Sequence, residues 1–389
     1  MSPPQFAFRV THTDGGARCG VMTTAHGDVE TPAFMPVGTQ GAVKAITNRD
    51  LEDLGAQIVL SNTYHLHLRP GDDLIARLGG LHRFVGWPRP ILTDSGGYQV
   101  FSLAARRTVD EQGVRFRSHL DGSSHLLTAE KAVDVQAQLG SDVAMVLDEC
   151  LAHPASIEAA RQSMDRTVRW ARRSRDRIEG LRAGSADGVI VSNSGQAQFG
   201  IVQGGIYPEL RQESACRTVA IGFEGYAIGG LSVGEPVDVM YDVVSYTSAF
   251  LPQDRPRYLM GTGTPADLIE SVARGIDLFD CVLPTRNARN GQLFTSRGRL
   301  NIKNARYAED DSPPDPACTC YTCRTASRAY LRHLFMAGEI AACTLNTLHN
   351  LNFYLDTMRR IRESVAFGRF ESFRQAFHQS FSRQSTDSE

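Results

Sequence analysis

No stretch of the 389-residue sequence stays apolar over the roughly 20 residues that a membrane-spanning helix needs. Residues 1–10 lack both the basic patch and the apolar core of a signal peptide, so we expect a cytoplasmic protein. Hydrophobic residues make up 42% of the chain and charged residues 22%, with a mean hydropathy of −0.25, as in soluble globular proteins. We therefore expect no membrane partner.

The sequence also lacks the cysteine usage of a disulfide-stabilised protein and a large excess of charge. Its 8 cysteines are few for the chain length, and 3 of them are clustered, which points to a metal site. The net charge of −2 argues against indiscriminate nucleic-acid binding, although a local basic patch is still able to bind RNA. Neither a P-loop nor a dinucleotide-binding fingerprint is present.

Short apolar, β-branched segments alternate with helical stretches, a pattern that favours βαβ units and a parallel sheet. Eight segments follow it: Ala33–Val37, Gln57–Leu60, Pro90–Thr93, Asp142–Leu147, Gln198–Val202, Gly225–Ile228, Arg257–Met260 and Asp277–Val282. Eight such units predict an α/β fold of the (β/α)8 TIM-barrel type, with the active site at the carboxyl ends of the strands. Polar residues or glycines stand at those ends: Asn62, Asp94, Asp148, Gln203, Gly229–Gly230, Gly261 and Asp280.

Three segments are predicted additions to the barrel. Residues 5–32 alternate polar and apolar residues between glycine turns, which predicts N-terminal β hairpins. The dipeptide Asp121–Gly122 predicts a further hairpin within residues 113–127. Residues 183–197 are small and polar, which is typical of a flexible surface loop.

The end of the chain carries an insertion and a helix. Leu351, Tyr354, Met358 and Ile361 recur at helical spacing, so we expect this segment to be helical and packed on the barrel. The expected organisation is a single catalytic barrel domain over residues 1–389, with a basic, zinc-binding subdomain at 284–350 and a C-terminal helical segment at 351–380.

The sharpest local pattern is Cys318-x-Cys320-x2-Cys323, with His349 standing 26 residues later. Thiolates at this spacing can converge on one ion, and a histidine completes the tetrahedral Cys3His shell of a structural zinc site. The alternative is three reduced cysteines in a loop. Because a closed shell leaves no position for water, the zinc would be structural and catalysis would come from elsewhere.

Residues 285–307 form a basic segment without any acidic residue. Its cations are Arg286, Arg289, Arg297, Arg299, Lys303 and Arg306. In a chain with a net negative charge this is the electrostatic signature of a phosphate backbone, and it begins just after the strand that carries Asp280. A solvated surface loop is the alternative, but we expect RNA to lie over the barrel mouth.

Three carboxylates, Asp94, Asp148 and Asp280, stand at predicted strand ends. Each alone would be explained as a helix N-cap. Three around one barrel mouth suggest chemistry, because carboxylates act as nucleophile, as general acid or base, or as acceptor for the donor-rich edge of a base. The Ser-Gly-Gly after Asp94 would bring backbone against a ligand, and Tyr98 would stack on a ring.

Two glycine-rich segments are ambiguous. The segment 261–267 (GTGTPAD) follows a strand and precedes a helix, so its N–H groups could take a phosphate. The segment 229–235 (GGLSVGE) could bring backbone donors to a carbonyl oxygen. For both segments an ordinary tight turn is the alternative.

The pair His65 and His67 after a barrel strand raises the possibility of a metal-dependent hydrolase. Such a site needs further histidines at later strand ends. No histidine occurs between His153 and His333, and the later strands end in Gln203 and Gly229. The hydrolase hypothesis therefore fails.

The motifs DSGGYQV, DEC, FGIVQGG, GGLSVGE, YLMGTGTP and FDCVLPTRNARNG, together with CxCxxC and its late histidine, resemble the bacterial tRNA-guanine transglycosylase (queuine tRNA-ribosyltransferase) family. The resemblance runs from about Phe34 to Phe373, and the order and spacing of the motifs make it specific. It implies a (β/α)8 barrel with a zinc subdomain, which exchanges the wobble guanine of tRNAs with GUN anticodons.

The resemblance also implies roles for residues. Asp280 resembles the nucleophile that attacks the ribose anomeric carbon, giving a covalent RNA–enzyme intermediate, and Asp94 resembles the general acid and base. Asp148, Gln203 and the Gly230 backbone resemble the groups that read the base edge, and Tyr98 and Met260 resemble its sandwich. The remaining implied base contacts are Ser95, Gly96, Gly97, Cys150, Gly229, Leu231 and Val233. The implied RNA contacts are Gly261, Thr262, Gly263, Thr264, Pro265, Ala266, Asp267, Thr285, Arg286, Asn287, Ala288 and Arg289.

Finer expectations follow from the same resemblance. Cys150 and Val233 match the bacterial form, which uses the 7-deazaguanine preQ1, whereas eukaryotic enzymes use queuine and have glycine at the second position. Family members pair as homodimers, and Tyr330, Leu331, Leu334 and Phe335 would either face a partner or pack on the zinc subdomain. The alternative function is a non-catalytic RNA-binding subunit, which should have lost its catalytic acids. All three acids are present here.

Overall fold

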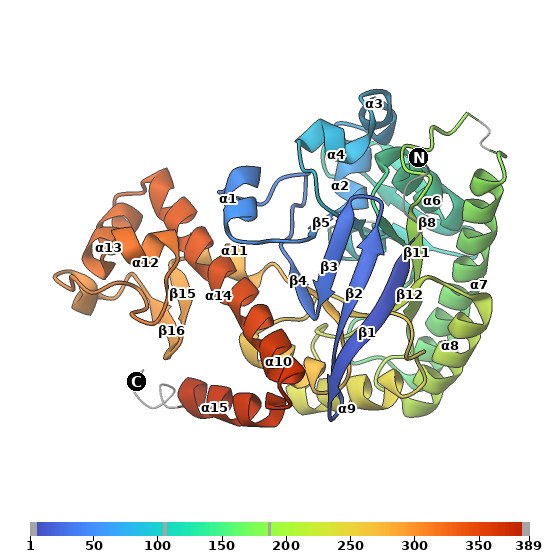
Figure 1. The fold of residues 1–389 in the computed structure, drawn as a ribbon. Helices are drawn as coiled ribbons and strands as arrows, with labels where there is room; N and C mark the ends of the chain where they lie inside the picture. The colour runs from blue at the N-terminus through green and yellow to red at the C-terminus, as the bar shows by residue number, and fades with distance from the viewer. Residues whose placement is uncertain (1–5, 104–106, 186–187, 383–389) are drawn as a thin grey trace.

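The computed structural model describes residues 6–103, 107–185 and 188–382, and its centre is an eight-stranded parallel barrel (Figure 1). The strands are β4 (Ala33–Met35), β5 (Val59–Ser61), β6 (Ile91–Thr93), β10 (Val143–Met145), β11 (Ala197–Val202), β12 (Gly225–Ile228), β13 (Arg257–Leu259) and β14 (Leu278–Asp280). They pair in the order β4-β14-β13-β12-β11-β10-β6-β5. The N–H of Gly38 donates to the Leu60 carbonyl over 2.7 Å, which joins the two outer strands and closes the barrel.

All eight predicted strands are present, and their burial explains why the sequence revealed them. Every residue of β11 is buried, as expected for a parallel strand that is covered on both faces. The paired segments are shorter than several predicted ones: Val146 and Leu147 are buried but lie beyond the end of β10. Apolar runs therefore mark the strands, while the loops at the barrel mouth also bury apolar residues.

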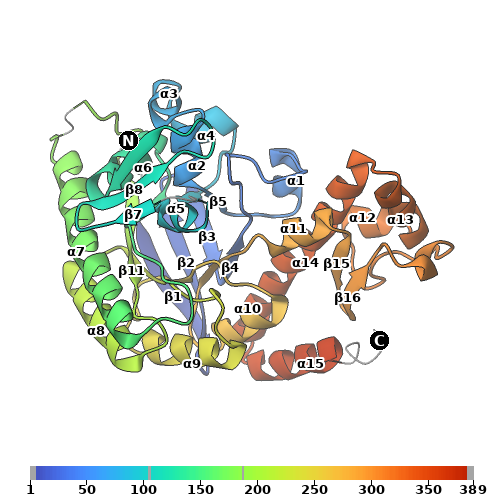
Figure 2. The same cartoon turned by 180° about the vertical axis from the view of Figure 1, so that it is seen from behind.

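Helices surround the barrel in the βα order that the alternating pattern predicted (Figure 2). They are α1 (Asn48–Asp53), α2 (Thr63–Leu68), α3 (Asp72–Arg77), α4 (Gly80–Val85), α5 (Gly97–Leu103), α6 (Ala129–Leu139), α7 (Ile157–Arg182), α8 (Pro208–Ile221), α9 (Val237–Ser248), α10 (Pro265–Val272) and α14 (Ile340–Ala366). Local sequence sets their ends: the Thr128 hydroxyl caps the first turn of α6, and Gly140 at φ 71° ends it.

The N-terminal hairpins form a three-stranded antiparallel sheet of β1 (Ala7–Asp14), β2 (Ala17–Thr24) and β3 (Gly27–Thr31), as predicted. Arg18 donates to both carboxylate oxygens of Asp277, which immediately precedes β14. The sheet is therefore anchored at the end of the barrel where the strands begin, hereafter the floor. Figure 1 shows it in front of the barrel, and Figure 2 shows the opposite end facing the viewer.

A second three-stranded sheet lies between α5 and α6 and consists of β7 (Arg107–Val109), β8 (Gly113–Arg117) and β9 (Ser124–Thr128). The predicted hairpin is present, but its loop spans residues 118–123 rather than a two-residue turn. Gly122, at φ 75°, donates its N–H to the Ser118 carbonyl over 2.9 Å. Asp121 instead accepts the N–H of Ser123, so the Asp-Gly pair belongs to a longer loop.

The prediction of a flexible loop at 183–197 is wrong for its second half. The Ser192 N–H donates to the Ala137 carbonyl over 3.0 Å, and the Asn193 amide donates to the Ser141 carbonyl over 3.1 Å. Asn193 and Gln196 are buried. Small polar residues are typical of mobile loops, but here they make hydrogen bonds to α6 and to the connection between α6 and β10.

A compact insertion follows β14. It contains α11 (Leu283–Arg289), β15 (Gln292–Thr295), β16 (Gly298–Asn301), the 3-10 helix η1 (Ala305–Tyr307), α12 (Tyr321–Thr325) and α13 (Arg328–Met336). Its apolar residues form a separate small core that includes Leu293, Ile302 and Leu331. Figure 1 shows this insertion beside the barrel, connected through α11 and α14.

Helix α14 links the insertion to the barrel without a break at residue 350. Its first part carries His349, and its second part buries Leu351, Tyr354, Met358 and Ile361 in the main core, as their spacing predicted. A final helix, α15 (Phe370–Ser382), packs against α10 and α14. Within the residues that the structure describes, no helix combines the length and apolarity of a membrane span.

Candidate active site

A cavity of about 490 Å³ opens at the end of the barrel where the strands finish, hereafter the mouth. This volume is in the range of small-molecule sites. Of the residues implied as base contacts or catalysts, the cavity is lined by Asp94, Ser95, Tyr98, Asp148, Cys150, Gly229, Gly230, Leu231, Val233, Met260 and Asp280. Gly96, Gly97 and Gln203 lie behind these and do not line it.

Asp94 follows β6 and is buried. The Asn62 amide donates to its Oδ2 over 2.5 Å, and the N–H groups of Thr63 and Gly96 donate to its Oδ1 over 2.9 and 3.2 Å. Burial, with a smaller contribution from the negative charge of Asp280, raises the pKa of Asp94 to about 6 despite the hydrogen bonds from Asn62 and Thr63. A carboxyl with a pKa near neutrality is suited to giving and taking a proton.

Asp280 ends β14, and both of its protein donors act on one oxygen. The Tyr258 hydroxyl donates to Oδ1 over 2.6 Å, and the Gly261 N–H donates to the same atom over 2.7 Å. Oδ2 receives no hydrogen bond from any residue that the structure describes. Burial raises the pKa of Asp280 above its ordinary value, although the hydrogen bonds from Tyr258 and Gly261 act in the opposite direction. The carboxylate is thus fixed through one oxygen and has the other available to a ligand.

Asp148 follows β10 and is held by two side chains. Ser95 Oγ donates to its Oδ1 over 3.2 Å, and Gln203 Nε2 donates to its Oδ2 over 2.7 Å. Burial raises the pKa of Asp148 to about 6. A Cβ added to Gly230 would lie 2.3 Å from Gln203 Oε1, so glycine is required there for Gln203 to keep its place.

The side chains implied as a base sandwich line the same cavity. Tyr98 on α5 is 50% exposed, and Met260 follows β13 and is half-buried. Exposed aromatic surface at a cavity provides a stacking face for a planar ring. The structure therefore brings both side chains to the cavity that holds the carboxylates.

The loop after β12 has a strained and well-anchored backbone. Ser232 adopts φ 58°, a left-handed conformation that is unfavourable for a residue with a side chain. The Glu235 carboxylate accepts the N–H groups of Ser232 and Val233, and Ser232 Oγ lies 2.8 Å from Thr262 Oγ1. Leu231, Ser232 and Val233 are thus held at the cavity wall.

The segment 261–267 forms a turn with a helix cap, so three of its six N–H groups are already used. The Gly261 N–H donates to Asp280, and Thr264 and Asp267 form a capping box at the start of α10. Pro265 has no N–H, and Thr262 is buried. Gly261, Gly263, Thr264 and Asp267 line the cavity, whereas Thr262, Pro265 and Ala266 do not.

Of the implied RNA contacts in the basic segment, Arg286 on α11 is exposed and lines the cavity. Arg289 is half-buried and donates to the Thr285 carbonyl over 2.8 Å. Thr285 and Ala288 are buried, and the Asn287 amide donates to Gln292. The other arginines of the segment, Arg297, Arg299 and Arg306, line a separate hollow of about 330 Å³.

The four predicted metal ligands converge between α12 and α14. The ligand atoms of Cys318, Cys320, Cys323 and His349 all lie within 4.8 Å of one another. His349 Nε2 lies 2.7 Å from the Phe294 carbonyl, so this nitrogen carries the proton and Nδ1 faces Cys323 Sγ at 3.2 Å. Three thiols and an unprotonated Nδ1 make up the donor set of a Cys3His site, so the cluster could hold a metal ion.

The His65 and His67 pair does not form such a site. Both lie on α2, where His67 Nδ1 contacts Asp72 at 2.6 Å and His65 packs edge-on to Tyr64 and His119. Neither belongs to a group of potential metal ligands among the described residues.

Sequence reasoning missed several residues at the cavity. Asn62 stands directly after a barrel strand, as Asp94 does, but its position alone predicted no role in the site. Tyr258 lies within β13, and no sequence pattern distinguishes it from an aromatic residue of the hydrophobic core. Gln99, Ser232 and Cys281 also line the cavity.

The chain thus combines a (β/α)8 barrel, three carboxylates around one mouth cavity and a Cys3His cluster in an insertion. The family model described as Queuine tRNA-ribosyltransferase matches residues 13–383. The chain therefore belongs to the queuine tRNA-ribosyltransferase family.

Curated relatives agree with this assignment over nearly their whole length. The Queuine tRNA-ribosyltransferase of Solidesulfovibrio magneticus is 57% identical over 367 residues, which cover 94% of this chain and 95% of the relative. That of Nitratidesulfovibrio vulgaris is 55% identical over 370 residues, covering 95% and 96%. That of Thermoanaerobacter sp. is 54% identical over 365 residues, covering 94% of each.

Proposed function

We propose that this enzyme exchanges the wobble guanine of tRNAs with GUN anticodons for preQ1, through a covalent bond between Asp280 and the ribose. The observation that carries the proposal is the mouth cavity, where Asp94, Asp148 and Asp280 are brought together in different hydrogen-bonding environments. These environments support three different roles for the same functional group.

Asp148 would read the edge of the base. A carboxylate accepts hydrogen bonds from the ring N–H and the amino group that guanine and 7-deazaguanine share. Gln203 and Ser95 hold Asp148, and the Gly230 backbone lies beside Gln203 as a further polar group. Tyr98 and Met260 would cover the two faces of the base.

Asp280 would act as the nucleophile and Asp94 as the general acid and base. In the first displacement Asp280 Oδ2 attacks the anomeric carbon, the bond from that carbon to guanine breaks, and Asp94 gives its proton to the departing base. In the second, the ring nitrogen of preQ1 attacks the same carbon, Asp94 takes its proton, and Asp280 leaves as a carboxylate. Two inversions restore the configuration, and the proton returns to Asp94.

The basic segment would hold the RNA during both steps. Arg286 is exposed at the cavity edge, where a phosphate or an anticodon base would pass. Arg289 would contribute by keeping α11 in place, because its guanidinium bonds to the helix backbone. The capping box at the start of α10 favours an ordinary turn over a phosphate site for residues 264–267.

The cysteine cluster would bind one structural zinc ion per chain. Cys318, Cys320, Cys323 and His349 would supply all four ligands, and zinc would cross-link α12 to α14. His349 is oriented for this role by the Phe294 carbonyl. The segment around Pro313, Pro314 and Pro316 would depend on this cross-link for its order.

The choice between preQ1 and queuine would depend on Val233. This side chain lines the cavity together with Cys150, and the Glu235 carboxylate fixes its backbone. A branched side chain at the wall would crowd the cyclopentenyl group of queuine, whereas the aminomethyl group of preQ1 is smaller. We therefore propose preQ1 as the substrate.

We also propose a homodimer in the cytoplasm, where tRNA functions. Leu331 and Leu334 are buried, and Leu331 is part of the insertion core, so these two pack on the subdomain. Tyr330 is 49% exposed and Met336 59% exposed on the same helix. An interface would therefore centre on Tyr330 and its exposed neighbours rather than on the leucines.

The alternative, a non-catalytic RNA-binding subunit, is opposed by the three carboxylates and their convergence on one cavity. A direct test is incubation with labelled guanine and an unmodified GUN-anticodon tRNA. We expect label to enter the tRNA, and the label should not enter a tRNA whose wobble base is changed. Binding of tRNA without incorporation would support the alternative.

A further inference from the structure

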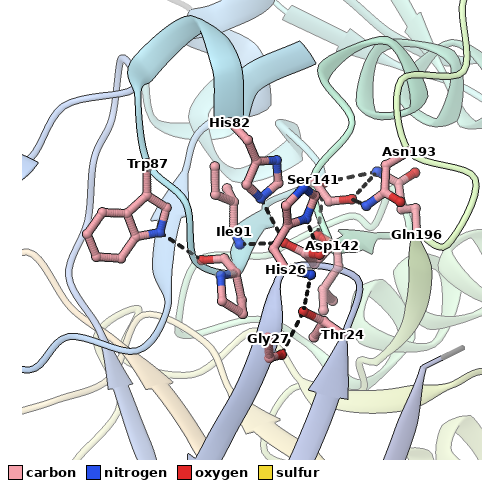
Figure 3. Close-up of polar contacts among 12 residues, drawn as sticks. Thr24, His26, Gly27, His82, Trp87, Ile91, Ser141, Asp142, Asn193 and Gln196 are labelled. Carbon is pink, nitrogen blue, oxygen red and sulfur yellow. Dashed lines mark hydrogen bonds and ion pairs between the residues drawn. The ribbon is translucent and has the colours of Figure 1, made fainter. Parts of the chain in front are cut away.

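Two histidines and an aspartate meet at the barrel floor, away from the mouth cavity. His26 lies in the turn between β2 and β3, His82 lies on α4, and Asp142 immediately precedes β10. His26 Nδ1 is 2.8 Å from Asp142 Oδ1, and His82 Nε2 is 2.9 Å from Asp142 Oδ2. Figure 3 shows both rings pointing to the one carboxylate from two different segments.

The two imidazole rings also contact each other. Their centroids are 3.5 Å apart and their planes differ by 13°, so His26 and His82 are stacked face to face. The Asp142 side chain is fully buried, His82 is 11% exposed and His26 is 32% exposed. Asp142 Oδ2 accepts one further hydrogen bond, from the Ile91 N–H over 2.9 Å.

This geometry is that of a hydrogen-bonded cluster and not of a metal site. A nitrogen lone pair lies in the plane of its imidazole ring, so two nearly parallel stacked rings cannot both direct lone pairs at one ion. The nitrogen–oxygen separations of 2.8 and 2.9 Å are ordinary hydrogen-bond lengths. With the proton of each neutral ring on the nitrogen nearest Asp142, both rings donate and the cluster is complete.

The charge of the cluster sets how many protons it can take. Burial would raise the pKa of Asp142, but the hydrogen bonds from His26 and His82 outweigh this and lower it to about 2, so the carboxylate stays ionised. One added proton places a single positive ring beside one negative carboxylate. A second proton would place two positive rings 3.5 Å apart with only one carboxylate to balance them.

The surroundings offer no other charge to balance a second proton. The groups labelled around the cluster in Figure 3 are neutral: Thr24 at the end of β2, Gly27 at the start of β3, Trp87, Ile91 at the start of β6, Ser141, Asn193 and Gln196. Asp28 and Arg83, the charged residues nearest to the two histidines along the chain, are exposed. The largest effects of charge on the pKa of Asp142 come from the two histidines.

We propose that His26, Asp142 and His82 form a proton-operated latch that holds the β2–β3 turn on the barrel floor and releases it when both imidazoles are protonated. Opening the turn separates the two rings, so the repulsion that opposes a second proton in the closed state is removed. The closed state then binds fewer protons than the open state, so acidification favours opening. The sheet's other anchor, Arg18 with Asp277, contains no histidine and provides an internal comparison.

The test is hydrogen–deuterium exchange of the zinc-loaded full-length enzyme between pH 7.5 and 5.0, with rates corrected for the intrinsic effect of pH. For wild type, protection of residues 20–31 should fall as pH decreases below about 6.5, by up to about tenfold per pH unit for one proton of difference. His26→Gln keeps an N–H donor for Asp142 and leaves a single imidazole beside the carboxylate, so its protection should not fall as pH decreases. His82→Gln should behave in the same way, and β1 should be unaffected in all three proteins.

Two results would overturn the latch. One is a wild-type protection of residues 20–31 that is independent of pH, or equally dependent on pH in wild type and in both glutamine variants. The other is a metal content of two ions per chain that falls to one in His26→Gln, which would make the cluster a metal site. Native mass spectrometry of the same preparations supplies the second measurement.

Discussion

The side-chain amide of Asn62 donates a 2.5 Å hydrogen bond to Oδ2 of Asp94. This contact stabilises the ionised form of Asp94 and so opposes the effect of burial, which raises the pKa of that carboxyl to about 6. Asn62 therefore determines how readily Asp94 gives up its proton. In the proposed mechanism the first displacement needs protonated Asp94, so formation of the covalent adduct should slow as pH rises above about 6.

Asn62→Ala should move this pH dependence to higher pH. A hydrogen bond to a charged group contributes about 1.5 kcal/mol or more, which corresponds to about one pH unit. Single-turnover rates of adduct formation between pH 5 and 9 would show the shift, with tRNA affinity as the control. An unchanged profile, or a shift to lower pH, would contradict the assignment of Asp94 as the acid.

Cys320→Ser should lower zinc content and thermal stability together, because Cys320 is one of four converging ligands and is buried. Cys216→Ser is the matched control, since Cys216 is exposed and outside the cluster. Metal analysis and thermal unfolding check both properties. If a zinc-free Cys320→Ser protein kept full stability and activity, the zinc would not be structural.

Arg286→Ala should weaken tRNA binding and lower the dependence of the binding constant on salt by about one released ion. Arg289→Ala should change the salt dependence less, because Arg289 is half-buried and bonded to the Thr285 carbonyl. Binding measured at several salt concentrations separates the two, and Arg286→Lys should retain most of the salt dependence. Equal slopes in wild type and Arg286→Ala would contradict the proposed phosphate contact.

Val233→Gly should admit queuine more readily, because it removes a branched side chain from the cavity wall. Val233→Ala should give an intermediate result. The measurement is the ratio of kcat/KM for queuine to that for preQ1. A wild-type enzyme that already uses both bases equally well would contradict the steric account.

The sequence was sufficient to predict the barrel because strands covered on both faces are continuously apolar, as β11 is. Asp94, Asp148 and Asp280 stand at the predicted strand ends, so the sequence alone indicated them as candidate site residues. The cysteine spacing predicted the cluster, since its ligands are close in the chain apart from His349. These features depend on local pattern, which a sequence contains directly.

Other features depend on contacts between distant segments. Tyr258 is inside a buried strand, and only the folded structure shows its hydroxyl on Asp280, 22 residues later in the chain. The anchoring of Asn193 requires the position of Ser141, and the stacking of His26 on His82 joins the N-terminal sheet to α4. Such pairings have no signature in composition or periodicity.

We propose that Asp280 attacks the ribose while Asp94 transfers the proton. Both line the same cavity, but Asp280 has one oxygen held by Tyr258 and Gly261 and the other without a protein donor among the described residues, whereas both oxygens of Asp94 accept hydrogen bonds. This difference favours Asp280 as the nucleophile. Loss of a general acid typically costs about 10² to 10⁴ in rate, whereas loss of the nucleophile removes the covalent route.

The most direct measurement is a denaturing gel of each protein after incubation with GUN-anticodon tRNA. Wild type should give a covalent protein–tRNA band, Asp280→Asn should give none even when a 7-deazaguanine base is added, and Asp94→Asn should bind tRNA but form the adduct very slowly. An adduct that persists in Asp280→Asn and disappears only in Asp94→Asn would reverse the two roles.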